Sequence, residues 1–460
     1  MRQINKLAWR FLIAAAMLFP ILYSCSKGGD GPDVQPPLTA ETTTPSKDVM
    51  LQTFYWDVTE GGIWWDNLNG KLDTWKNAGI TALWLPVISK GQSGKWSMGY
   101  DPADYFDFGK YDQYGTVETR FGSETELLSL LTNAKGKGFK LVADIVLNHN
   151  SGGEQESNPV AGKLTYTKFQ PKSGKFFRSY SDFHPNAQHV SDEGSFGDMP
   201  DLCHDVDNVK SWFWLRDDGV GKYYKNVLGF DGWRFDYVKG FSPNIVKTWN
   251  ANVGGSISIG EYWDGNVTLV NDWCKASQSG AFDFPLFYGM RDAFNGGNLS
   301  NLDGKGLIAV NPEAAYTFVD NHDLRNAGED IVDAQKMKAY CYILTATGTP
   351  FIFYSDYESL LDKSKLNQLI WIRKNLAAGS MTKLYSSSNE YIFRRNGTPG
   401  LLTYLNIGNT AVQQKVRTTW GNSVLKDYTG NNPDVTTDAS GYVTIGCQPN
   451  SYAVYSVKGL

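Results

Sequence analysis

Eight short apolar segments, each followed by a polar loop and a helical stretch, recur along the chain from residue 49 onward. Strands that alternate with helices in this way form parallel sheets, and eight such units can close into a barrel. The sequence therefore predicts an α/β fold, a (β/α)8 TIM barrel. The predicted strands are residues 49–56, 80–86, 140–146, 232–236, 256–261, 281–286, 316–321 and 350–354.

Two regions depart from this repeat. About 85 residues separate the third and fourth predicted strands, which is more than one loop and one helix require. The Gly-, Ser- and Asp-rich residues 150–205 are therefore predicted to be an inserted subdomain of a barrel formed by residues 48–149 and 206–383. After the barrel, apolar residues recur with a period of two, as in residues 390–395. This pattern predicts a C-terminal antiparallel β-sandwich domain at residues 384–460.

The first 24 residues are predicted to be a signal peptide. Basic residues precede an apolar run at residues 11–23 that is too short to span a membrane. The run ends in Leu-Tyr-Ser-Cys and resembles a bacterial lipoprotein signal, in which the cysteine is lipidated and becomes the new N-terminus. The resemblance implies export and a lipid anchor at Cys25, in the outer membrane on its surface or periplasmic face. A plain secretory signal is the alternative. Residues 25–47, rich in Gly, Pro and Thr, are predicted to be a flexible linker.

Charged side chains stand where several predicted strands end. Arg234 and Asp236 lie two positions apart, so on a strand they point to the same side. Glu261 ends the fifth predicted strand, and Asp323 follows the seventh. In a barrel of this kind the carboxyl ends of the strands meet at one mouth, where catalytic residues lie. A cap or a structural ion pair could explain any single carboxylate. Three carboxylates beside one arginine predict a catalytic site.

The amino-acid composition favours some classes of ligand over others. Aromatic residues make up 14% of the chain, with Trp 15 and Tyr 25, and aromatic faces stack on sugar rings as well as filling cores. The net charge of −5 argues against a nucleic-acid partner. A carbohydrate is therefore the class of ligand to consider.

The segments around His149, Asp236, Glu261 and Asp323 resemble, in this order, the four sequence signatures of the α-amylase family of glycoside hydrolases (family 13). The resemblance extends over residues 48–460 and is greatest to the compact plant and archaeal α-amylases. It implies that Asp236 is the nucleophile and that Glu261 is the general acid/base of a retaining reaction. It also implies that Asp323 is a third carboxylate, which binds ring hydroxyls and distorts the sugar.

The same resemblance implies a set of substrate contacts. An aromatic ring would stack under the sugar that is cleaved, two histidines would hydrogen-bond its hydroxyls, and a lysine would contact the sugar on the leaving side. The tryptophan after the fifth strand is either a further platform or a packing residue. The residues concerned are Tyr100, His149, Arg234, Lys239, Trp263 and His322.

A calcium site is implied by the comparison with this family. Calcium takes several oxygen ligands, and an ion here would attach the inserted subdomain to the barrel. The ligands would be Asn148, Asp192 and Asp201 and the carbonyl oxygens of Gly194 and Gly240. The four cysteines after Cys25 are scattered and form no CxxC pair, so neither a zinc site nor a dense disulfide framework is predicted, and the sequence leaves open a single disulfide without assigning its pairing.

These inferences lead to a retaining, endo-acting α-amylase that hydrolyses internal α-1,4 bonds of starch-like glucans, with Ca²⁺ as its cofactor. We expect a monomer that contacts a membrane only through its lipid anchor. A maltooligosaccharide or cyclodextrin hydrolase, or a transglycosylase of the same family, is the enzymatic alternative. A glucan-binding protein without activity would be expected to lack one of the three carboxylates, and all three are present.

Overall fold

The computed structural model describes residues 35–460, and residues 36–460 form one compact unit. The predicted signal peptide, the predicted lipidation site Cys25 and the first part of the predicted linker lie outside the described residues. Within the described residues, no helix is both long enough and apolar enough to cross a membrane.

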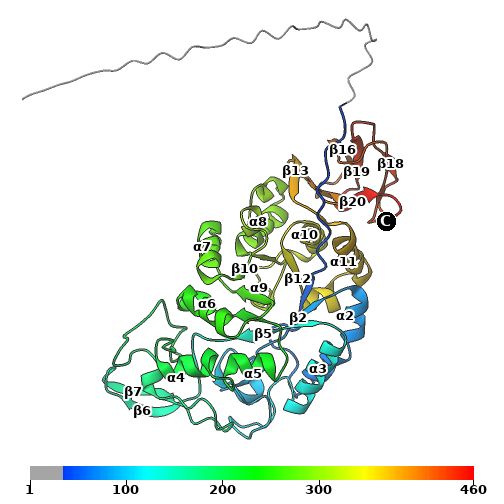
Figure 1. Ribbon diagram of the computed structural model, residues 1–460. Coiled ribbons are helices and arrows are strands. Elements are labelled where there is room, and N and C mark those ends of the chain that lie inside the picture. The colour runs from blue at the N-terminus through cyan, green and yellow to red at the C-terminus, as the bar shows by residue number, and fades with distance from the viewer. Residues whose placement is uncertain (1–34) are drawn as a thin grey trace, which may run out of the picture. The chain divides into compact units, whose positions relative to one another are not determined.

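Eight strands, all paired in parallel, close into a barrel in the order β1-β12-β11-β10-β9-β8-β5-β2. Each strand falls within or beside a predicted segment, so the (β/α)8 prediction is confirmed. Figure 1 shows helices packed around these strands. The barrel strands are β1 (Met50–Gln52), β2 (Ala82–Trp84), β5 (Lys140–Ile145), β8 (Gly232–Phe235), β9 (Ile257–Gly260), β10 (Gly280–Phe282), β11 (Ala315–Thr317) and β12 (Thr349–Phe353).

Local capping residues explain where several helices begin. Ser123 and Glu126 form a reciprocal capping box at the start of α3, and Ser242 caps α6 ahead of a proline. The sixth predicted strand is too long, because Asp283 ends it by capping α8. The helices are α1 (Trp64–Asn69), α2 (Leu72–Ala78), α3 (Glu124–Gly136), α4 (Asp207–Lys210), α5 (Val220–Asn226), α6 (Pro243–Asn252), α7 (Val267–Ser277), α8 (Phe284–Asn295), α9 (His322–Ala327), α10 (Asp333–Thr345) and α11 (Lys363–Leu376).

Aromatic side chains from different strands fill the barrel interior. Trp84, Phe282, Phe318 and Phe351 contact one another with ring centroids 5.1–5.9 Å apart, and all four are buried. The interior is therefore a packed core, and ligand access is limited to the ends of the strands.

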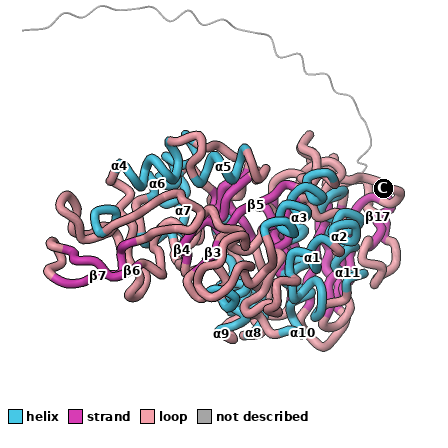
Figure 2. Tube along the Cα trace, turned by 90° about the horizontal axis from the view of Figure 1, so that it is seen from below, coloured by secondary structure: helices cyan, strands magenta, loops and turns pink. Residues whose placement is uncertain are grey.

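The chain between β5 and β8 forms the predicted insertion. It contains the hairpin of β6 (Glu154–Asn158) and β7 (Lys163–Lys168), which projects from the barrel at the end away from the C-terminal domain (Figures 1 and 2). A β-bridge between His149 and Asp201 returns the insertion to the end of β5. A second short hairpin, β3 (Lys90–Gly91) and β4 (Pro102–Asp104), lies in the loop after β2.

The C-terminal domain is antiparallel, as predicted. One sheet has six strands in the order β13-β14-β15-β20-β17-β18, and β16 pairs with β19 in a second sheet. Buried residues of both sheets, including Tyr404 and Ile445, form one hydrophobic cluster. The strands are β13 (Met381–Ser386), β14 (Glu390–Arg395), β15 (Leu401–Asn406), β16 (Val412–Arg417), β17 (Val424–Asp427), β18 (Val435–Thr436), β19 (Tyr442–Cys447) and β20 (Ser451–Val457).

The linker prediction is wrong for residues 36–47, because this segment is bonded to the folded chain. Leu38 donates its N–H to the carbonyl of Thr418 at 3.3 Å, and Arg417 donates to the carbonyl of Pro36 at 2.6 Å. The Glu41 carboxylate accepts from the N–H of Ser380 at 2.9 Å. Backbone groups supply most of these bonds, which is why the composition of the segment did not reveal them.

Candidate active site

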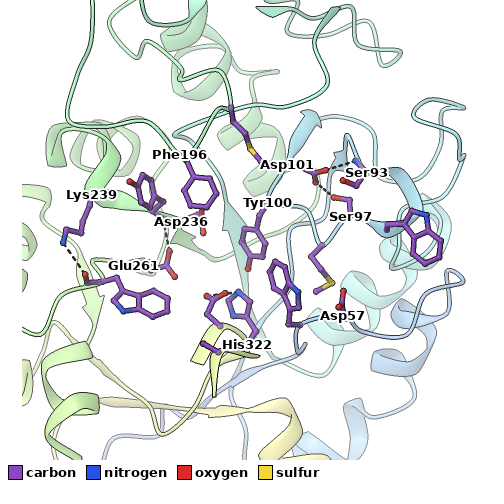
Figure 3. A pocket seen from close by; sticks show the side chains of 18 residues that line it. Asp57, Ser93, Ser97, Tyr100, Asp101, Phe196, Asp236, Lys239, Glu261 and His322 are labelled. Carbon is purple, nitrogen blue, oxygen red and sulfur yellow. Dashed lines mark hydrogen bonds and ion pairs between the residues drawn. The ribbon is translucent and has the colours of Figure 1, made fainter. Parts of the chain in front are cut away.

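A cavity with a volume of about 850 Å³ opens at the carboxyl ends of the barrel strands. Figure 3 shows it from close by, with Asp236, Glu261 and His322 on its floor. Most of the side chains predicted to act on a substrate line it. They are Tyr100, Asp236, Lys239, Glu261, Trp263, His322 and Asp323.

Arg234 joins the two central carboxylates. Its Nη1 lies 2.7 Å from Asp236 Oδ1, and its Nη2 lies 2.6 Å from Glu261 Oε1. The guanidinium is fully buried, so these charge-assisted contacts are only weakly screened by water. Arg234 comes from β8 and Glu261 follows β9, and parallel pairing of Phe235 with Gly260 brings the two strand ends together.

Asp144 is a third partner of this arginine and was not assigned a role from the sequence. Its Oδ1 accepts from Arg234 Nη1 at 2.7 Å, and its Oδ2 accepts from Tyr100 and from Trp84 at 2.9 and 3.1 Å. Burial raises the pKa of Asp144 to about 6, although the arginine opposes that shift. A charged residue inside the otherwise apolar strand β5 was the available signal.

Glu261 and Asp323 hold protons more tightly than ordinary carboxyl groups. Burial, followed by the charges of Asp236 and Asp323, raises the pKa of Glu261 well above its usual range, and Arg234 opposes this. Burial and the charge of Asp236 raise the pKa of Asp323 to about 7. The backbone N–H of Tyr237 donates to Glu261 Oε2 at 3.0 Å and fixes that carboxyl group. The site therefore contains a carboxyl group able to remain protonated near neutral pH.

His322 is held in its neutral form beside Asp323. Burial, with a further contribution from Arg234, lowers its pKa well below the usual range. Its Nδ1 is hydrogen-bonded to Gln52 Nε2 at 2.9 Å, which leaves Nε2 3.3 Å from Asp323 Oδ2. Because an amide nitrogen donates, Nδ1 accepts and Nε2 carries the proton. Gln52 at the end of β1 therefore sets the tautomer.

Three rings form an aromatic surface on one side of the carboxylates. Trp56, Tyr100 and His322 lie with ring centroids 5.5–6.1 Å apart and with planes within 20° of parallel. All three line the cavity. Such a surface presents apolar faces of the kind that sugar rings stack on. Trp56 was not predicted, because a sequence does not show which aromatic residue at a strand end stays exposed.

Two predicted substrate contacts, Arg234 and His149, do not line the cavity: Arg234 lies beneath it on the carboxylates, and His149 is covered. His149 is buried, and its Nε2 is hydrogen-bonded to the carbonyl of Tyr100 at 2.9 Å. The ring of Phe196, from the insertion, stacks on it with centroids 4.7 Å apart. Contact between His149 and a ligand would require Phe196 to move. Phe196 itself lines the cavity and was not predicted.

Lys239 and Trp263 lie at the other side of the carboxylates. Lys239 Nζ forms an ion pair with Asp264 at 3.0 Å and lies over the ring of Tyr262. Trp263 stacks on Phe284 with centroids 4.8 Å apart, and its Nε1 donates to Tyr288 at 2.7 Å. Trp263 therefore packs against the barrel and also lines the cavity, which combines the two alternatives left open by the sequence.

Three of the predicted calcium ligands, the side chain of Asn148 and the carbonyl oxygens of Gly194 and Gly240, converge on one point. The side-chain oxygen of Asn148 faces only hydrogen-bond acceptors; with its amide reversed, the nitrogen would donate to the carbonyls of Gly194 and Gly240 at 3.2 Å. A carbon added at Gly240 would lie 1.9 Å from that oxygen, so only glycine fits there. In the present orientation three oxygens meet without a proton between them, which is the donor set of a hard cation.

The other two predicted ligands are the carboxylates of Asp192 and Asp201, and the N–H of Gly194 donates to Asp192 Oδ1 at 3.3 Å. Asp201 Oδ1 is buried and has no hydrogen-bond partner, while Asp201 Oδ2 lies 2.9 Å from His184 Nδ1. Ligand atoms of His184, Asp192 and Asp201 all lie within 4.8 Å of one another. Burial and the charge of Asp201 raise the pKa of Asp192 to about 6. An unpaired buried carboxylate oxygen beside a second carboxylate and carbonyl oxygens fits a bound Ca²⁺.

Comparison with known proteins agrees with this geometry. The sequence matches the family described as "Alpha amylase, catalytic domain" over residues 59–391 and "Alpha-amylase C-terminal" over residues 401–456. An α-amylase of Geobacillus stearothermophilus is 27% identical, over 98% of this chain and 93% of the relative. The glucan 1,4-alpha-maltohexaosidase of Bacillus sp. (strain 707) is also 27% identical, over 79% of this chain and 80% of the relative.

The solved structures show the same fold. The α-amylase of Geobacillus thermoleovorans, complexed with acarbose, superposes with a TM-score of 0.68 at 19% identity, over 89% of this chain and 98% of that chain. An α-amylase of Malbranchea cinnamomea gives a TM-score of 0.69 at 17% identity, over 89% and 95% of the two chains. With the catalytic-domain match covering most of its length, the chain belongs to the α-amylase family of glycoside hydrolases.

Proposed function

We propose that the protein is a retaining, endo-acting α-amylase that hydrolyses internal α-1,4 bonds of starch-like glucans. The observation that carries the proposal is the pair formed by Asp236 and Glu261 on one buried guanidinium, at the floor of a cavity lined by aromatic rings. Bridging by a single arginine favours the short separation of about 5–5.5 Å that retaining glycosidases use.

Asp236 is the nucleophile in this proposal. Its Oδ1 is oriented by Arg234, which leaves the other oxygen to attack the anomeric carbon. The new C–O bond forms as the bond to the leaving oxygen breaks, and the leaving oxygen takes a proton from Glu261. The raised pKa of Glu261 keeps that proton in place near neutral pH.

The second half of the reaction reverses these roles. Glu261, now ionised, accepts a proton from a water molecule, whose oxygen attacks the anomeric carbon and releases Asp236. Asp323 and His322 Nε2 lie on the same cavity floor and would bind hydroxyls of the sugar being cleaved. The ring of Tyr100 would support that sugar from below, held by its bond to Asp144.

A Ca²⁺ ion has a structural role in the proposal. Asn148, Asp192 and Asp201 and the carbonyls of Gly194 and Gly240 would hold it, and they come from the barrel and from the insertion. When bound, the ion supplies a charged cross-link between these two parts. Gly240 and Asn148 stand close to the strands that carry the catalytic pair, so the ion would support the cavity without taking part in proton transfer.

The relatives carry names of two kinds, and the second kind corresponds to the alternative activity on oligosaccharides. Some are named α-amylase, and others are named for one product, such as the glucan 1,4-alpha-maltotetraohydrolase of Stutzerimonas stutzeri, which is 28% identical over 80% of this chain. A hydrolase of short oligosaccharides or a transglycosylase would use the same carboxylates. The activity on long chains must therefore be measured.

The test is product analysis on amylose with protein that begins at Pro36. We expect rapid loss of iodine staining and a mixture of α-configured oligosaccharides. Glu261→Gln should remove this activity, and Glu126→Gln, which keeps the α3 capping box, should retain it. Maltose alone, slow action on the polymer or lengthened oligosaccharides would point to the alternative. An inactive wild type in the presence of calcium would overturn the proposal.

We also propose that the protein is exported and lipid-anchored through Cys25. The proposal rests on the sequence of the first 25 residues alone. Labelling of cells with a radioactive fatty acid should label the protein, and Cys25→Ala should abolish the label. An unlabelled wild-type protein released into the medium would instead indicate a plain secretory signal.

A further inference from the structure

Trp96 is a large aromatic side chain that remains exposed inside the cavity wall. Its side chain is 56% exposed although it lines the same cavity as Asp236 and Glu261. Exposed single apolar residues are common on surfaces, but an exposed indole in a cavity that already holds a row of rings presents a face to a ligand.

The turn that carries Trp96 is held by buried groups. Arg120 donates to the carbonyl of Trp96 at 3.0 Å and to the carbonyl of Val58 at 2.7 Å. Ser93 donates its N–H to Asp101 at 2.7 Å on the other side of the turn. Arg120 is buried, so the backbone position of Trp96 is fixed while its ring stays free. Because the backbone that carries the ring is already ordered, only side-chain freedom is lost when the ring binds a ligand.

One contact covers the ring of Trp96. Lys95 Nζ lies 4.7 Å from the indole centroid, and among the described residues no other aromatic ring stacks on Trp96. Trp371, the comparably exposed tryptophan of α11, is 41% exposed but stacks on Tyr428 with centroids 5.6 Å apart. Trp96 thus differs from Trp371 in two ways: no aromatic ring of the described residues stacks on it, and it lines the cavity.

The position of the turn defines which part of a glucan it would meet. In Figure 3, Ser93 and Ser97, which flank the turn, lie at the end of the cavity opposite Lys239, with Tyr100 and His322 between. Lys239 is the residue expected on the leaving side. A chain that passes over Tyr100 toward Trp96 is therefore the part that stays bonded to Asp236 after cleavage.

We propose that Trp96 is a distal glucan-binding platform, which stacks on a glucose unit remote from the scissile bond and thereby sets the length of the released product. The inference rests on the proposed α-glucan hydrolysis. Because the distance between the platform and Asp236 is fixed, chains long enough to reach both bind best. Short oligosaccharides that cover only the cavity floor do not contact Trp96, so their binding does not depend on it.

Binding and turnover test the platform separately. In the Glu261→Gln background, Trp96→Ala should raise the Kd for maltoheptaose about tenfold, the loss expected for one stacking contact. In the active enzyme, kcat/KM for maltoheptaose should fall by a similar factor while that for maltotriose stays unchanged, and early products from amylose should become shorter. Trp371→Ala is the matched control and should change none of these values.

The outcomes separate this inference from the proposed function. Equal losses on both oligosaccharides, or unchanged binding and products in Trp96→Ala, would overturn the platform. Trp96→Tyr should keep most of the affinity, and it provides the test if Trp96→Ala does not fold. If the wild type cleaves no α-glucan but Trp96 still controls maltoheptaose binding in the Glu261→Gln background, the proposed hydrolysis fails and the binding platform stands.

Discussion

Replacing Asp201 by asparagine tests whether the oxygen cluster beside the cavity binds calcium. Asp201 is the buried carboxylate of the group, and its Oδ1 has no hydrogen-bond partner, so this oxygen is free to bind a cation. The substitution keeps the shape of the side chain and removes one negative charge. The contact between the charged Oδ2 of Asp201 and His184 Nδ1 becomes a hydrogen bond to an uncharged amide.

The magnitude follows from ligand linkage. Loss of a group that only orients a metal ligand weakens metal binding by about 10–100-fold, so loss of a direct anionic ligand should reach at least the upper end, about 100-fold. A 100-fold change in the ratio of free calcium to Kd corresponds to about 2.7 kcal/mol of stabilisation of the folded state. The Asp201→Asn protein should therefore lose most of the calcium-dependent part of its stability.

Thermal unfolding with calcium and with a chelator measures this difference. We expect the wild type to unfold at a clearly higher temperature with calcium, and Asp201→Asn to unfold at nearly the same temperature in both conditions. Asp182→Asn is the control, because Asp182 is buried in the same insertion but lies outside the oxygen cluster. It should lower both temperatures and keep the calcium response. A wild type that is insensitive to the chelator would refute the calcium site.

Three further predictions concern the pH profile, a buried ion pair and the N-terminal segment. Asp323→Asn removes one of the charges that raise the pKa of Glu261, so the alkaline limb of the residual kcat/KM should move to lower pH; a shift to higher pH would contradict this assignment. Lys336→Met leaves buried carboxylates such as Asp356 unpaired and should cost about 3–5 kcal/mol in urea unfolding, and an unchanged midpoint would exclude that role. Removing residues 36–47 should lower the unfolding temperature relative to a chain that begins at residue 36, and equal temperatures would show that their bonds to the C-terminal domain contribute nothing.

The sequence was sufficient to predict the barrel, because strand formation here depends on local apolar runs that alternate with helices. The strand β8, for example, lies within the segment 232–236 that was predicted as the fourth strand. The candidate carboxylates could be placed at one mouth for a similar reason, whereas their individual roles were implied by the resemblance to the α-amylase family. Asp236 and Glu261 directly follow strands, and the carboxyl ends of parallel strands must meet at one mouth.

Contacts between separate strands were decided only by the tertiary structure. The bridge from Arg234 to Glu261 depends on the register of β8 against β9, and the third partner, Asp144, comes from β5. The pKa shifts of the site depend on burial, which no single segment specifies. Sequence reasoning therefore identified candidate reacting groups but not the network that orients them.

Two contacts could not be predicted from the local sequence. Phe196 covers His149, and residues 36–47 bind to the folded chain. In the first case a ring from the insertion lies over a residue of the barrel, and the two are separated by more than forty positions in the chain. In the second case a segment with the composition of a linker is held largely through backbone atoms, which every residue carries. The sequence by itself determined where the barrel strands form and which side chains are candidates for the chemistry. The tertiary structure decided which of those side chains a ligand can reach, because exposure depends on what the rest of the chain places above them.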